Sequence, residues 1–206
     1  MRIPSTRART LPAADSFDAA YFRRFYGSPA TRVAARADYA RMARFIGAYL
    51  DVLQLPVSSI LDAGAGTGHF RSALRRRFPA ADYLGLDISG YACARYGWTQ
   101  ASIANFDQGR FDLVICHDVL QYLGRRDAEQ ALANLGRCCD GALYFMALTR
   151  EDWRENCDQS RTDGAVHLRS ADWYRRRLAP CFRNLGGGLF LARRANAVSF
   201  ALHASR

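Results

Sequence analysis

The sequence predicts an α/β protein with a mostly parallel sheet that is covered by helices on both faces, and two observations lead to this fold class. From about residue 57 onward, short apolar segments typical of buried strands alternate with amphipathic segments typical of helices. Such alternation is typical of parallel sheets, whose strands are joined by crossover helices. At 206 residues, the chain is long enough for one such domain and too short for two of ordinary size.

Two helices are predicted before this alternation begins. An aromatic-rich segment at residues 16–26 favours a short helix, which the glycine and proline at 27–29 would end. A longer helix with one apolar stripe is predicted from about residue 31 to residue 52. We therefore expect a flexible tail at 1–15, a helical cap at 16–55 and a core at 56–206.

The core is predicted to begin with a buried strand and to alternate from there. Strands are expected at 57–62, 82–87, 98–104, 111–117 and 142–148, and helices at 67–78, 89–96 and 127–138. The polar, irregular segment 149–169 is long enough to be a functional loop rather than a simple connector. After it we expect a helix from Ser170 to before Pro180, and then two strands at 182–191 and 197–203.

The most informative segment is Ile60-Leu-Asp-Ala-Gly-Ala-Gly-Thr-Gly-His-Phe70, which combines a strand end, a glycine turn and a helix start. Gly64, Gly66 and Gly68 let the backbone approach a ligand closely, and the helix start offers unpaired N–H groups. The segment therefore predicts a site for a nucleotide-like ligand. Its spacing is G-x-G-x-G rather than the G-x-G-x-x-G of dinucleotide-binding turns. Asp62 would repel a pyrophosphate but suits a ligand with an ammonium group.

A second acid strengthens the prediction of a nucleoside site. Asp87 closes the next predicted strand, 25 residues after Asp62. In a strand–helix–strand unit this position faces the ligand crevice, where a carboxylate can accept hydrogen bonds from both ribose hydroxyls. A further strand end follows in the segment FDLVICHDVLQYL at residues 111–123.

In their order and spacing, these three segments resemble the class I S-adenosylmethionine-dependent methyltransferases, firmly so over residues 57–148. The resemblance implies a Rossmann-like, doubly wound, mostly parallel seven-stranded sheet with a closing antiparallel hairpin. It implies S-adenosylmethionine as the cofactor and methyl transfer by direct in-line displacement, for which the protein mainly aligns the nucleophile and excludes water.

The resemblance also implies which residues hold the cofactor. The turn at 63–68 would surround the amino-acid part, with Asp62 near the ammonium group, often through water. Asp87 would bind the ribose, Ile88 would face the adenine and His117 would line the methyl-donor end. Ordinary structural roles, such as capping and packing, remain alternatives for these residues. The implied cofactor set is Asp62, Ala63, Gly64, Ala65, Gly66, Gly68, Asp87, Ile88, Ser102, Ile103 and His117.

In the adenine loop the chain departs from the usual pattern of the family. Many members carry an aspartate where this chain has Ser102, whose hydroxyl accepts hydrogen bonds more weakly. Ile103 follows it as the apolar member of the pair. Gln100 is a competing candidate for the adenine contact.

Two histidines and two tyrosines are candidates for roles in catalysis. A hydroxyl acceptor would need a general base, for which histidine is the usual choice, so His117 and His167 are the candidates. Tyr26, and Tyr21 near it, would orient an acceptor, although packing is the alternative role for each. We expect the segments 16–26 and 149–169 to form a lid over a small-molecule acceptor.

Several subclasses lack their motifs here. The fourth strand ends in His117-Asp118-Val119-Leu120, without the Asn/Asp-Pro-Pro-Tyr-like segment of amino-group methyltransferases that act on DNA and some RNA. The Pro-Cys nucleophile of cytosine-C5 enzymes and the paired-glutamate loop of protein arginine methyltransferases are also missing. The fifth strand ends without paired acids, so no metal site is implied. A nicotinamide dehydrogenase is disfavoured by the glycine spacing.

The charge pattern keeps two alternatives open. The net charge is +10 and all 29 basic residues are arginine, which excludes lysine chemistry. Arginine clusters at 75–77, 125–126, 175–177 and 193–194 allow an RNA methyltransferase of the same fold. Solvated helix faces and helix ends are the simpler explanation of these clusters. A non-catalytic cofactor-binding protein is the other alternative.

The apolar runs, the first residues and the cysteines indicate the cellular compartment. No apolar run approaches the ~20 residues that cross a bilayer, and the first residues do not have the pattern of a secretory signal. The six cysteines form no C-x-x-C pair and are expected to be structural thiols. We expect a cytoplasmic protein without a membrane partner, and the oligomeric state stays open.

Overall fold

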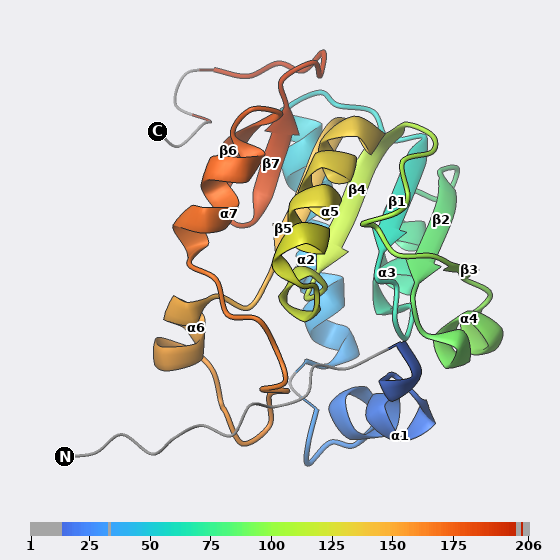
Figure 1. Ribbon diagram of the computed structural model, residues 1–206. Coiled ribbons are helices and arrows are strands. Elements are labelled where there is room, and N and C mark those ends of the chain that lie inside the picture. The colour runs from blue at the N-terminus through green and yellow to red at the C-terminus, as the bar shows by residue number, and fades with distance from the viewer. Residues whose placement is uncertain (1–13, 33, 201–202, 204–206) are drawn as a thin grey trace.

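The computed structural model describes residues 14–32, 34–200 and 203, and a seven-stranded sheet forms its centre (Figure 1). The strand order is β3-β2-β1-β4-β5-β7-β6. The first five strands are parallel to one another, whereas β7 is antiparallel to both β5 and β6. This confirms the predicted doubly wound fold and its antiparallel hairpin. The strands are β1 (Ser59–Ala63), β2 (Asp82–Asp87), β3 (Thr99–Gln100), β4 (Phe111–His117), β5 (Cys139–Met146), β6 (Phe182–Gly186) and β7 (Leu189–Ala192).

Helices cover both faces of the sheet (Figure 1). One face packs against α2 (Arg36–Val52) and α3 (His69–Arg77), and the other against α5 (Arg125–Cys138) and α7 (Ala171–Leu178). Successive residues of β4 divide between the two cores, as the period of a strand requires: Ile115 faces α2 and α3, and Val114 faces α5. Both are fully buried, and each such side chain contributes about 1.5–3 kcal/mol to the free energy of unfolding.

The chain before the sheet divides into two parts. The predicted helix at 16–26 is resolved into three short turns, which are η1 (Ala14–Ser16), α1 (Ala19–Phe22) and the π-helical η2 (Arg23–Gly27). The longer helix begins at Arg36 rather than near residue 31, because the Asp38 carboxylate accepts a 2.6 Å hydrogen bond from the Ala35 N–H and fixes the helix start there. Of the predicted tail at 1–15, residues 1–13 lie outside the described residues.

The closing hairpin is shorter than the sequence predicted. Both of its strands lie within residues 182–192, and residues 193–200 contain no strand, so the predicted strand at 197–203 is wrong for the part described. The turn forms at Gly187 and Gly188, whose φ angles are +58° and +82°. Glycine adopts these left-handed conformations without steric cost, so the chain reverses here rather than near residue 195.

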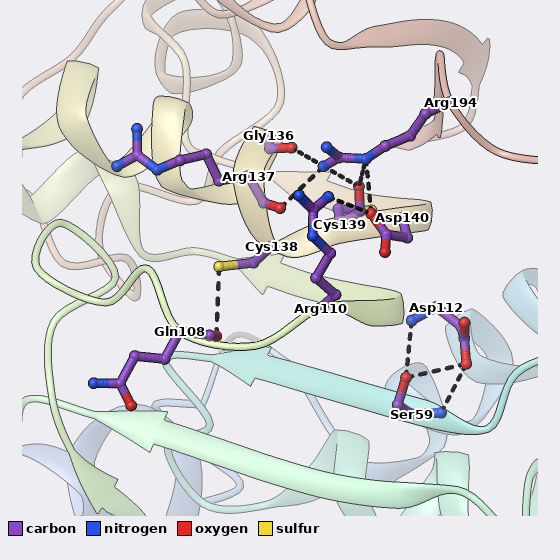
Figure 2. A network of polar contacts seen from close by, with 10 residues as sticks. All are labelled: Ser59, Gln108, Arg110, Asp112, Gly136, Arg137, Cys138, Cys139, Asp140 and Arg194. Carbon is purple, nitrogen blue, oxygen red and sulfur yellow. Dashed lines mark hydrogen bonds and ion pairs between the residues drawn. The ribbon is translucent and has the colours of Figure 1, made fainter.

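Polar contacts join the amino ends of three central strands, at the edge of the sheet opposite the carboxyl ends (Figure 2). Asp112 of β4 accepts a 3.0 Å hydrogen bond from the Ser59 N–H of β1. Arg110 and Arg194 both pair with Asp140 of β5, at 2.8 and 2.7 Å. Arg194 also donates to the Cys139 carbonyl, at 2.8 Å. One of the clustered arginines is therefore part of the scaffold.

Candidate active site

The glycine turn between β1 and α3 requires glycine at specific positions. Gly64 has a φ angle of +83°, and a Cβ atom there would lie 2.2 Å from Cγ2 of Val119. The N–H groups of Gly64 and Ala65 both donate 2.8 Å hydrogen bonds to the Leu86 carbonyl. The turn is therefore bonded to β2 on one side and packed against the segment after β4 on the other.

Trp98 supports this turn from beneath. Its Nε1–H donates a 2.9 Å hydrogen bond to the Gly66 carbonyl. Its ring lies so close to Gly68 and Gly85 that Cβ atoms at these positions would stand 3.0 and 2.3 Å from it. The sequence analysis missed Trp98, because its contacts with the two glycines arise only in the folded chain.

Asp87 lies at the carboxyl end of β2 and is 8% exposed. One carboxylate oxygen accepts a 2.8 Å hydrogen bond from the Gly66 N–H, and the other accepts one of 2.8 Å from the Ser89 N–H. Burial raises the pKa of this carboxyl group, and the backbone donors lower it again in part. Each carboxylate oxygen has two acceptor positions, so both keep one for hydroxyl groups in the cleft.

Asp62 is 2% exposed and lies beside Tyr83, whose hydroxyl donates to its Oδ2 atom. Burial raises the pKa of the carboxyl group to about 7, against the lowering effect of the Tyr83 hydrogen bond. Tyr83 was not predicted, because its contact to Asp62 crosses between neighbouring strands. The carboxylate sits where a cationic group of a ligand would restore its charge at neutral pH.

A cleft of about 80 Å³ lies at the carboxyl ends of β1, β2 and β4. Phe17 and Phe22 of the N-terminal segment lie over it, and Ala101 is part of its wall. Gln100 does not line it, and its Nε2 donates instead to the Ile88 carbonyl at 3.3 Å. Seven of the predicted cofactor residues line this cleft: Gly64, Gly66, Asp87, Ile88, Ser102, Ile103 and His117.

A smaller cavity of about 30 Å³ lies on the other side of the glycine turn. Asp62, Ala65 and Thr67 line it, together with His117 at the end of β4. The predicted residues Ala63 and Gly68 line neither cavity, since Ala63 is fully buried in the sheet. The turn therefore separates the cleft from this smaller cavity.

His117 lines both of these cavities, and its neighbour Asp118 lines the cleft. His117 Nδ1 lies 3.1 Å from Asp118 Oδ2, and its ring stacks on Tyr144 at 6.0 Å. Asp118 has a φ angle of +59°, a left-handed conformation that aspartate tolerates better than most residues. The sequence analysis missed Asp118 because nothing in the strand pattern predicts the reversal of its backbone. The other predicted base, His167, lines none of these cavities, and its backbone N–H donates to the Gln121 carbonyl at 2.7 Å.

A larger cavity of about 320 Å³ adjoins the cleft. The N-terminal segment and residues 146–163, which include α6 (Arg150–Glu155), form its walls. Four residues line both the cleft and this cavity: Tyr21, Tyr26, Asp118 and Tyr122. Burial raises the pKa of Tyr26 well above its ordinary value, so its hydroxyl stays protonated. Both segments that were predicted to form a lid therefore contribute walls.

Two absences concern only the described part of the chain. Within residues 14–32, 34–200 and 203, no group of three or more His, Cys, Asp or Glu side chains is arranged to hold a metal ion. No helix in those ranges is long and apolar enough to span a membrane.

The sheet order, the glycine turn and the acid after β2 together define a doubly wound protein with a cleft at the carboxyl ends of its strands. Residues 61–141 match a family model described as a methyltransferase domain. A curated relative, trans-aconitate 2-methyltransferase of Deinococcus radiodurans, is 37% identical over 87 residues, which are 39% of this chain. The chain spans about a third of that relative's length, 33% of it being covered.

Two solved structures have the same fold. The magnesium protoporphyrin IX methyltransferase of Synechocystis PCC 6803, with bound S-adenosylmethionine, is 21% identical, with a TM-score of 0.56 over 82% of this chain and 84% of that one. The plantazolicin methyltransferase BpumL, in complex with a triazolic desmethylPZN analog and S-adenosylhomocysteine, is 16% identical, with a TM-score of 0.59 over 81% of this chain and 74% of that one. Residues 61–141 of the chain therefore correspond to a methyltransferase domain, and the solved methyltransferase structures share its fold.

Proposed function

We propose that this chain is a methyltransferase that binds S-adenosylmethionine in the cleft and transfers its methyl group to a small organic acceptor in the adjoining cavity, without a metal ion. One observation carries the proposal: the carboxyl ends of β1, β2 and β4 bring two buried acids to either side of a glycine turn that is open to a cleft. The family relationship and the cofactor named for one neighbour support it.

The residues present fit this cofactor. Asp87 retains acceptor positions for two ribose hydroxyls, and Ile88 and Ile103 offer apolar surface for an adenine ring. Asp62 offers a carboxylate for the ammonium group. A Cβ on Gly66 would meet only Phe22 and the Gly64 carbonyl, at 3.7 and 3.9 Å, so the side of the turn toward the cleft is open.

The chain's own residues would align and desolvate the reactants. When bound, the cofactor supplies a methyl group on a positively charged sulfur. His117, which lines the cleft and the smaller cavity, and Asp118, which lines the cleft and the larger cavity, would face this methyl group. The Tyr26 hydroxyl, kept neutral by burial, would orient the acceptor as a hydrogen-bond donor or acceptor rather than as a base. The aromatic N-terminal segment would exclude water. The role of His167 as a base stays a prediction.

The acceptor is proposed to be a small molecule rather than RNA. Several of the clustered arginines already have partners within the chain: Arg77 pairs with Asp51, Arg177 with Glu129, and Arg194 with Asp140. Arg177 also lies 3.9 Å from the centroid of the Trp173 ring. These guanidinium groups support helix ends and strand ends, which leaves fewer of them for phosphates.

The test is the formation of S-adenosylhomocysteine when the purified chain receives S-adenosylmethionine and a fractionated extract of small metabolites. We expect product with the low-molecular-weight fraction and not with total RNA. The Asp87→Asn variant should lose cofactor affinity and therefore form less product. Its matched control is Asp82→Asn, which changes an exposed acid at the start of the same strand. Product only with RNA would favour the alternative. Cofactor binding without product from either fraction would favour a non-catalytic binding protein.

A further inference from the structure

The acceptor cavity is acidic, although the chain as a whole carries a net charge of +10. Among the described residues, its lining includes no arginine or histidine and four aspartates, which are Asp118, Asp152, Asp158 and Asp163. No arginine nitrogen lies within 4 Å of these four carboxylates in the part of the chain described. An acidic lining of this kind disfavours an anionic acceptor, because like charges in a partly enclosed space repel each other.

Gln121 provides an independent observation at the same cavity. It is 3% exposed, lines the cavity, and its Oε1 atom has no hydrogen-bond partner. Its Nε2 donates to Asp118 Oδ1 at 3.4 Å, and this bond fixes which end of the amide is left free. A buried carbonyl oxygen without a partner costs about 1–3 kcal/mol, so it is a position where a ligand's hydrogen-bond donor would be stabilised.

The aspartates are held in place by local bonds that leave acceptor capacity. Asp163 Oδ1 accepts from the Ala165 N–H at 2.9 Å, and Asp158 Oδ1 accepts from the Ser160 N–H at 3.0 Å. Asp152 accepts from Asn156 Nδ2 at 2.9 Å. Four phenol rings complete the wall, and their faces attract cations: Tyr21, Tyr26, Tyr39 and Tyr122.

We propose, on the basis of the function proposed above, that the methyl acceptor carries a positively charged amino group, which Gln121 and the aspartates of this cavity hold. The charged nitrogen anchors the acceptor, since an ammonium group has no free electron pair with which to accept a methyl group. Its N–H groups donate to Gln121 Oε1 and to the carboxylates of Asp118 and Asp163. The acceptor's apolar part lies against the tyrosine rings.

Calorimetry on the chain loaded with S-adenosylhomocysteine tests this proposal with three probes of similar size. The probes are phenethylamine, which is cationic, phenylethanol, which is neutral, and phenylpropionate, which is anionic. We expect phenethylamine to bind at least about tenfold more tightly than either of the others, because hydrogen bonds to charged groups are the stronger ones. Equal binding, preference for phenylpropionate or no binding of phenethylamine at millimolar concentration would overturn the proposal.

Two variants connect the preference to this cavity. Gln121→Leu and Asp163→Asn should each weaken phenethylamine binding about tenfold and leave phenylethanol binding nearly unchanged. Asp172→Asn is the matched control, since this exposed aspartate pairs with Arg176 on α7, away from the cavity. If both variants bind phenethylamine as the wild type does, the amine does not occupy this cavity and the proposal is wrong.

Binding of S-adenosylhomocysteine itself is measured first and separates the two proposals. If it binds and the amine preference is absent, only the acceptor class is wrong. If it does not bind, the proposed function fails, and the charge preference of the cavity is then tested on the unloaded chain with the same probes.

Discussion

The N–H of Gly66 donates a 2.8 Å hydrogen bond to Oδ2 of Asp87, so the glycine turn and the end of β2 form one unit beneath the cleft. The same carboxylate also accepts from the Ser89 N–H, at the start of α4 (Gly90–Tyr96). Asp87 therefore has two tasks: it fixes the shape of the turn, and it presents acceptors toward a ribose. A substitution here would change both the ligand contacts and the geometry of their support.

Asp87→Asn should weaken S-adenosylhomocysteine binding by about 1–3 kcal/mol, because the amide nitrogen cannot accept from a backbone donor or from a hydroxyl. Calorimetry measures the affinity, and circular dichroism verifies the fold. Asp82→Asn, at the exposed start of the same strand, should bind as the wild type does. Unchanged affinity in a folded Asp87→Asn variant would remove this residue from the site.

Trp98→Phe isolates the bond between the Trp98 Nε1–H and the Gly66 carbonyl. The ring of phenylalanine keeps much of the apolar contact, whereas the carbonyl loses its donor. We expect a loss of about 1 kcal/mol in the free energy of unfolding and a comparable loss in cofactor affinity. Trp153→Phe, outside the glycine turn, is the matched control. An equal effect of both substitutions on cofactor affinity would mean that the bond does not support the turn.

Gly64→Ala places a methyl group 2.2 Å from Val119 Cγ2 at a φ angle of +83°. Backbone strain and overpacking each cost about 1–3 kcal/mol, so chemical denaturation should report a loss of at least that size. Adding Val119→Ala should recover the part due to the clash and leave the part due to φ. Gly124→Ala, with no atom within 4 Å and a φ angle of −56°, should be close to neutral.

How far the sequence predicts this site depends on how local each contact is. Gly64 and Gly66 were predicted because closely spaced glycines in one short segment determine the conformation of the turn. Asp87 was predicted because the carboxyl ends of parallel strands meet at one edge of a sheet. Trp98 and Tyr83 were missed because their roles arise only when β2 and β3 pack beside the turn. Such contacts join residues that no periodic pattern relates to each other.

The closing hairpin shows that sequence patterns also predict the fold only in part. The strand pairing of β5 with β7 is implied by the resemblance, but its register depends on where the chain reverses. The run of three glycines at 186–188 sets that point, and Phe45 and Met146 fill the space beside Gly187 and Gly188. The alternation of apolar residues beyond 193 is therefore not used by the sheet in the described residues.

Asp62 should make the stability of the chain depend on pH. Its pKa is raised by burial to about 7, from 3.8, so between these values the folded chain holds a proton that the unfolded chain has released. The wild type should therefore lose stability relative to Asp62→Asn as pH rises from about 4 to about 7, by up to about 4 kcal/mol. Below this window the difference is constant, and above it the loss is complete.

Urea denaturation of both proteins at several pH values measures this difference directly. Tyr83→Phe removes the hydrogen bond that lowers the pKa of Asp62, so it should move the upper end of the window to higher pH. A difference between wild type and Asp62→Asn that does not change between about pH 4 and pH 7 would mean that Asp62 titrates as an exposed acid does.

The last prediction concerns the lid formed by the segments 16–26 and 149–169. The cleft under the N-terminal segment measures about 80 Å³, which is less than the roughly 300 Å³ of small ligand sites, so this segment has to shift to admit the cofactor. Few bonds hold it: the Tyr21 and Tyr122 hydroxyls are hydrogen-bonded at 2.8 Å, and Ser89 Oγ donates to the Phe17 carbonyl. Its other contacts with the core are apolar, through the buried rings of Phe17 and Phe22. Opening therefore breaks few hydrogen bonds but exposes these two rings.

Hydrogen exchange, measured with and without S-adenosylhomocysteine, tests the lid directly. Both segments should exchange more slowly when the ligand is bound, since closure orders them over the reacting groups. Tyr122→Phe keeps the ring and removes the bond to Tyr21, so residues 16–26 should exchange faster in the unliganded variant while global stability falls by only about 1 kcal/mol. Tyr91→Phe, on the exposed side of α4, is the control for loss of a hydroxyl. If the ligand slows exchange in the glycine turn but in neither segment, these segments are fixed walls and the cofactor enters by another path.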